Sequence, residues 1–128
     1  DAAGGQAVIV HGGADPGHPT ALRAALGTTF VLPTYSAPSL AALFEWTARH
    51  GIRTAATSAK ADAVLWDADL RPPLAVLVGN EGEGLGADTI ARCDLRVGIP
   101  MLGTATSLNV SVAAGVVLYE VRRQTADD

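Results

Sequence analysis

Residues 99–121 read IPMLGTATSLNVSVAAGVVLYEV and combine the end of a strand, a polar loop and a long apolar helix. Upstream, residues 74–85 read LAVLVGNEGEGL, in which a buried strand runs directly into a glycine-rich turn. Each stretch places a loop with accessible backbone immediately after a strand. In open α/β sheets, ligands bind outside the carboxyl ends of the strands. The two stretches therefore predict one ligand site at that edge of a sheet.

The rest of the chain alternates short apolar runs with helical patterns, which is typical of a parallel or mostly parallel α/β sheet flanked by helices. We expect the 128 residues to form a single domain. The terminal helix is apolar nearly all round, which predicts that it is buried. The expected strands are 6–11, 53–57, 74–78 and 95–99, with a short one at 30–32, and the expected helices are 19–26, 40–50, 86–93 and 107–123.

Composition limits the classes of function. The net charge of −4 argues against strong, sequence-independent binding of nucleic acid. The single cysteine, Cys93, excludes an intramolecular disulfide framework and predicts a cytoplasmic protein. No apolar run approaches the roughly 20 residues that a membrane span needs, so no membrane partner is expected. The opening residues 1–5 resemble a helix end with its glycine cap, which predicts that the chain is truncated at its N-terminus.

The candidate site residues each have two interpretations. The 79–85 loop is either a turn that needs glycine and asparagine, or a loop that approaches a cofactor with Glu81 facing the reaction. It lacks the Lys-Ser or Lys-Thr pair of a Walker loop. Ser107 fits a helix N-cap, whereas Asn109 in the first turn of an apolar helix needs a partner or a ligand. The backbone of Ile99 and Met101 either ends a strand or reads an adenine edge.

Three segments carry a resemblance to a known family. GNEGEGL at 79–85, followed by the quoted 99–121 segment, resembles the second and third motifs of the TrmH/SpoU family. RAALGTTFVLP at 23–33 resembles the segment that precedes them, so the likeness covers nearly the whole chain. The members of this family are RNA 2′-O-ribose methyltransferases of the SPOUT superfamily. The resemblance implies a C-terminal deep trefoil knot, which periodicity alone does not predict because knots are rare.

The resemblance also implies roles for particular residues. S-adenosylmethionine would bind in the knot, against Thr57 and Ser58 at one strand end and against Gly79 and Asn80 at another. Ile99, Met101 and Leu108 would hold the adenine, and Glu81, Ser107 and Asn109 would organise the reacting end. The implied reaction is methyl transfer to a ribose 2′-hydroxyl of rRNA or tRNA, with no metal. The implied partners are the RNA and a second copy that binds through the C-terminal helix.

One departure from the family pattern leaves an alternative open. The first motif of the family supplies an asparagine and an arginine just before the position at which this chain begins with Asp1. No residue here matches that arginine, and Arg23 matches a different position. The chain is therefore expected to be either part of an active methyltransferase or a catalytically incomplete knotted module that binds cofactor or RNA.

Overall fold

The computed structural model describes residues 1–61, 63–80 and 82–126, which form two compact units that divide between Leu43 and Phe44. The first unit contains β1 (Val8–Val10), α1 (Pro19–Ala24), the 3₁₀ helix η1 (Thr28–Phe30) and β2 (Thr34–Ser36). Strands β1 and β2 pair in parallel, with Val8 opposite Thr34. Helix α2 (Leu40–Arg49) contains the boundary between the units.

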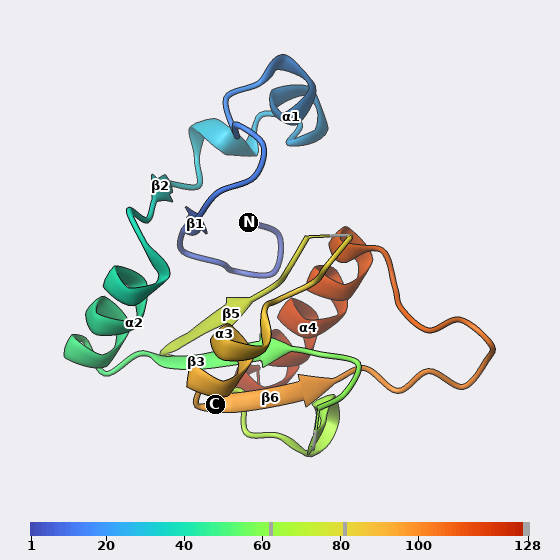
Figure 1. Ribbon diagram of the computed structural model, residues 1–128. Helices are drawn as coiled ribbons and strands as arrows, with labels where there is room; N and C mark the ends of the chain where they lie inside the picture. The colour runs from blue at the N-terminus through green and yellow to red at the C-terminus, as the bar shows by residue number, and fades with distance from the viewer. Residues whose placement is uncertain (62, 81, 127–128) are drawn as a thin grey trace. The chain divides into compact units, whose positions relative to one another are not determined.

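The second unit is built on a parallel sheet of four strands. Figure 1 labels three of them, β3, β5 and β6. Its elements are β3 (Arg53–Thr57), β4 (Ala63–Val64), η2 (Leu65–Asp67), β5 (Leu74–Leu77), α3 (Ala87–Arg92), β6 (Leu95–Gly98) and α4 (Val110–Thr125). The strand order is β4-β6-β3-β5, so β6, the last strand in the chain, lies between two earlier ones. The predicted α/β class with parallel strands is confirmed, although the hydrogen bonds of the described residues define two sheets.

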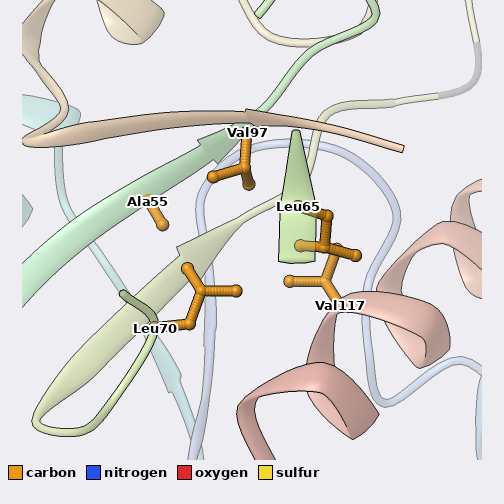
Figure 2. Close-up of a cluster of buried hydrophobic side chains, with 5 residues drawn as sticks. All are labelled: Ala55, Leu65, Leu70, Val97 and Val117. Carbon is orange, nitrogen blue, oxygen red and sulfur yellow. The ribbon is translucent and has the colours of Figure 1, made fainter. Parts of the chain in front are cut away.

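A small apolar core joins α4 to the sheet. Val117 of α4 is fully buried among side chains from β3, β6 and the connection between β4 and β5. Figure 2 shows these side chains pointing toward one another; they are Ala55, Leu65, Leu70, Val97 and Val117. Because neighbouring strand residues face opposite sides of a sheet, Ala56 is buried on the other face. The central strand β3 is thus covered on both faces, as parallel strands usually are.

Polar contacts also attach α4 to the connection after η2. The Gln124 side chain accepts a hydrogen bond from the Leu70 amide at 2.8 Å and donates one to the Ala68 carbonyl at 2.9 Å. It donates a further bond to Glu120 at 2.8 Å. This amide therefore satisfies two backbone groups in a connection that has no regular hydrogen-bonded ladder.

Two sequence predictions about elements are wrong. Residues 30–32 were expected to form a strand, but Phe30 ends η1, and the pairing with β1 begins only at Thr34. The terminal helix was expected to be buried all round, yet only one stripe of it meets the sheet. Val117 is fully buried, whereas Val112 is 52% exposed and Tyr119 is 57% exposed.

Candidate active site at the carboxyl ends of the strands

The carboxyl ends of three strands meet at one edge of the four-stranded sheet. The registers place Ala56 of β3 opposite Leu77 of β5 and Thr57 opposite Val97 of β6. The Thr57 hydroxyl donates to the Leu77 carbonyl at 3.2 Å, which ties the ends of β3 and β5 together. The chain therefore leaves the three strands at adjacent positions along this edge. The predicted site residues at the ends of these strands, or just after them, are Thr57, Ser58, Gly79, Asn80 and Ile99.

The end of β3 is held closely against β6. The Ser58 amide donates to the Val97 carbonyl at 3.0 Å, and the Ser58 hydroxyl accepts a bond from the Lys60 amide at 3.2 Å. A Cβ atom at Gly98 would lie 3.1 Å from the Ser58 carbonyl oxygen, so a larger residue would press on this backbone. Ile99 follows directly and packs against the core cluster. These contacts fix where the 99–109 segment leaves the sheet.

The loop after β5 closes on itself. The side-chain oxygen of Asn80 accepts hydrogen bonds from the amides of Gly82 at 3.0 Å and Glu83 at 2.7 Å. The Asn80 carbonyl accepts a third bond from the Gly84 amide at 3.0 Å. Gly84 has a φ of +66°, a conformation that glycine adopts without strain. The interpretation of this segment as a glycine-dependent turn is thus confirmed, and the loop also stands beside the predicted site.

Gly79 is the position at which the loop is most crowded. A Cβ atom there would lie 2.0 Å from the Gly84 carbonyl carbon and 2.2 Å from the Leu85 nitrogen. Both neighbours are backbone atoms, so no side-chain rotation relieves the overlap. Glycine is required here for close approach of two backbone segments. Glu81, the carboxylate predicted to face the reaction, lies outside the described residues.

The segment from 99 to 109 has neither helix nor strand and runs out from β6 as a long loop before it reaches α4 (Figure 1). Met101 is half-buried, whereas Leu102 is 99% exposed. Ser107 is exposed, and Leu108 is 37% exposed. Five predicted site residues belong to this segment. Ile99 and Met101 lie where the loop leaves the sheet, whereas Ser107, Leu108 and Asn109 lie at its far end, next to α4.

The structure caps α4 with Asn109 instead of with Ser107. We expected α4 to begin at Ser107 with Asn109 in its first turn, but α4 begins at Val110 and Asn109 is its N-cap. The Asn109 side-chain oxygen accepts bonds from the amides of Ser111 at 2.9 Å and Val112 at 3.4 Å. Asparagine caps helices as well as serine does, and an asparagine at the cap satisfies amides that otherwise lack partners.

Among the described residues, the groups with shifted pKa values lie away from this edge. Hydrogen bonds from the hydroxyl and the amide of Thr54 hold the pKa of Asp94 below its ordinary value. This pair ties the start of β6 to β3, at the opposite end of the strands. Burial raises the pKa of the Cys93 thiol, which keeps it protonated and unreactive. Hydrogen bonds from Arg123 and Gln124 lower the pKa of Glu120 on α4.

The described residues also form two hollows outside the strand-end edge. One of about 310 Å³ lies between η2 and the end of α4 and is lined in part by Trp66, Arg71 and Gln124. Another of about 430 Å³ lies near the start of β3 and is lined in part by Phe44 and Asp94. Neither is lined by the predicted cofactor residues. In the described residues, no helix is long and apolar enough to cross a membrane.

Comparison with known proteins defines the class. The sequence model of the SpoU rRNA Methylase family matches residues 1–119, and the chain belongs to this family. The resemblance predicted from the motifs at 79–85 and 99–121 is therefore confirmed. A similar curated protein is the 23S rRNA (guanosine-2′-O-)-methyltransferase RlmB of Pseudomonas aeruginosa, which is 38% identical over 125 residues. That alignment covers 97% of this chain and 50% of the relative, so the chain spans half of its length.

Solved structures agree with this class. The SpoU methyltransferase AviRb from Streptomyces viridochromogenes, in complex with AdoMet, has a TM-score of 0.92 and 37% identity, covering 98% of this chain and 50% of that chain. A chain from a structure concerned with 2-OH methylation of C/U34 on tRNA has a TM-score of 0.87 and 32% identity. It covers 95% of this chain and 80% of that chain. Relatives of this chain are thus described as acting on rRNA and on tRNA.

Proposed function

We propose that this chain is the methyl-transfer domain of an RNA 2′-O-ribose methyltransferase that uses S-adenosylmethionine. The observation that carries the proposal is the convergence of three strand ends at one edge, with the Gly79 loop beside them, in a chain of the SpoU family. Because the family match runs through both compact units, we treat residues 1–128 as one functional domain.

The residues at the strand ends suit this cofactor. Thr57 and Ser58 would form one wall, Gly79 and Asn80 a second, and Ile99 and Met101 the third, to which Leu108 would add from the α4 end of the 99–109 loop. The 99–101 segment offers backbone donors and acceptors next to partly buried apolar side chains, which is what recognition of an adenine requires. The exposed carboxylate of Glu83 on the loop favours a cationic sulfonium and opposes a phosphate. When bound, the cofactor supplies a methyl group that the sulfonium makes reactive.

The protein's own part in the reaction is alignment of the ribose hydroxyl for in-line attack. We assign this to Glu81, Ser107 and Asn109. The Asn109 side-chain oxygen accepts the Ser111 amide at 2.9 Å, which fixes this side chain at the start of α4. The 2′-hydroxyl has a high pKa and loses its proton during transfer.

Three further features belong to the same proposal. A trefoil knot in the C-terminal part is supported by the position of β6 between β3 and β4, because a late strand must enter between earlier ones. A homodimer through α4 is supported by an exposed apolar stripe at helical spacing, made of Val112, Val116 and Tyr119. A cytoplasmic location is supported by the free, buried thiol of Cys93.

Calorimetric titration of the 128-residue chain with S-adenosylhomocysteine, the product form of the cofactor, tests the proposal. We expect saturable binding to one site, and weaker binding by Asn109→Ala if Asn109 faces the ligand. Transfer of a labelled methyl group to 23S rRNA or to tRNA transcripts then identifies the RNA. Absence of any binding would count against the cofactor site. Binding without transfer to either RNA would favour the alternative of a catalytically incomplete module.

A further inference from the structure

Asn80 organises the loop that follows β5. Its side-chain oxygen is the acceptor for two consecutive loop amides, Gly82 at 3.0 Å and Glu83 at 2.7 Å. An amide side chain can offer these two amides only its oxygen, because its NH₂ group is a donor. The side-chain oxygen of Asn80 is therefore committed to the loop and is not the atom that meets a ligand.

The same residue also closes the loop through its backbone. Its carbonyl accepts the Gly84 amide at 3.0 Å, and Asn80 and Gly84 form an isolated antiparallel bridge. The residue before it, Gly79, packs so tightly on Gly84 that a Cβ atom there would lie 2.0 Å away. The two ends of the loop are thus in contact, and the three bonds to Asn80 set the path between them.

We infer that Asn80 is a positioning residue for methyl transfer, which acts by accepting the Gly82 and Glu83 amides and so preorganises the loop wall of the cofactor site. This inference rests on the proposed function and refines the place of Asn80 in it. An ordered wall loses less conformational freedom on binding than a loop that the ligand must order. The required chemistry is an acceptor at this position, and the NH₂ group is dispensable.

Three variants separate the acceptor from the donor. Asn80→Ala removes both, Asn80→Asp keeps an acceptor of the same length and removes the donor, and Asn80→Ser keeps a shorter acceptor. Asp15→Ala is the matched control, because the Asp15 carboxylate accepts the Gly17 amide at 2.8 Å in another exposed, glycine-containing loop. Each variant is measured by amide hydrogen exchange, followed residue by residue with NMR, and by calorimetric titration with S-adenosylhomocysteine.

We expect Asn80→Ala to speed exchange at Gly82 and Glu83 by about tenfold and to weaken ligand affinity by about tenfold, as loss of two modest hydrogen bonds implies. For Asn80→Asp, the exchange rates and the ligand affinity should stay within about threefold of the unchanged chain. Asn80→Ser should give values between those of Asn80→Asp and Asn80→Ala. The Asp15→Ala control should leave the affinity unchanged.

Two results would overturn the inference. One is exchange at Gly82 and Glu83 that does not respond to Asn80→Ala. The other is an Asn80→Asp chain whose affinity falls as far as that of Asn80→Ala although its loop amides stay protected, which would assign the ligand contact to the NH₂ group. If the unchanged chain binds no ligand while Asn80 still protects both amides, the cofactor assignment fails and the organising role of Asn80 stands.

Discussion

Replacing Gly79 with alanine puts a single methyl group where two backbone segments already touch. The added Cβ would lie 2.0 Å from the Gly84 carbonyl carbon, whereas ordinary contacts begin at 3.4 Å. The difference, 3.4 − 2.0, requires the backbone to move by at least 1.4 Å. Strain of this kind in a packed region typically costs about 1–3 kcal/mol. Because the loop is largely exposed, opening it is the easiest way to relieve the strain.

The expected result of Gly79→Ala is a loss of ligand affinity that accompanies a modest loss of stability. If the ligand binds only to the closed loop, binding must restore the strained conformation. The affinity for S-adenosylhomocysteine then falls by about 10- to 100-fold, because each tenfold change in affinity corresponds to roughly 1.4 kcal/mol. The midpoint of thermal unfolding should fall by roughly 4 °C for each kcal/mol of global strain. Calorimetric titration and thermal unfolding measure the two effects separately.

Gly82→Ala is the matched control in the same loop. Among the described residues, a Cβ atom at Gly82 would meet the Asn80 side-chain oxygen at 3.6 Å, which is ordinary contact. We therefore expect this variant to bind like the unchanged chain and to change stability by less than about 0.5 kcal/mol. Equal affinities for the two alanine variants would refute the argument that close approach at Gly79 shapes the site.

Three other predictions concern the core, the helix attachment and acid stability. Val117→Glu should unfold the chain, because it buries an unpaired charge, and circular dichroism detects this loss of structure. Val116→Glu lies on the exposed stripe, so it should keep the monomer folded and weaken self-association, which analytical ultracentrifugation measures. Gln124→Ala should destabilise the fold by about 1–3 kcal/mol in urea unfolding, since it leaves backbone groups of the connection after η2 without partners. Because the pKa of Asp94 is lower in the folded chain than in the unfolded chain, its stabilising contribution is complete above the ordinary value of 3.8 and disappears as pH falls through the lowered pKa. Thr54→Val, which removes one of the two donors, should make the loss of stability in acid shallower in urea unfolding repeated across that pH range.

The sequence predicts the parallel strands well, because their signals are local. β3 lies at 53–57 as predicted, and β5 and β6 each end one residue earlier than expected. β5, which reads LAVL between Pro73 and the Gly79 loop, is a short apolar run, as strands buried in parallel sheets usually are. The carboxyl-edge site follows from the same reasoning, since parallel strands bring their ends to one edge.

The features that the sequence does not predict depend on partners far away in the chain. β4 contains only Ala63 and Val64, and it exists because β6 pairs with it. Ser107 and Asn109 are both good caps, and where α4 meets the sheet decides which of them is used. The acceptor role of Asn80 was missed as well, although asparagine two residues before a glycine is a known signal for a side chain that bonds its own loop.

The position of β6 between β3 and β4 also sets an order of events during synthesis. The strand that completes the middle of the sheet is made after both of its neighbours, so it emerges from the ribosome when they have already been exposed for some time. Until residues 95–98 arrive, the pairing edges of β3 and β4 that face each other have no partner, and an open strand edge can pair with other chains. Because β6 completes the sheet late, we expect the yield of folded protein to fall at high chain concentration and to rise with chaperones. The stability of the native state alone would not predict this dependence.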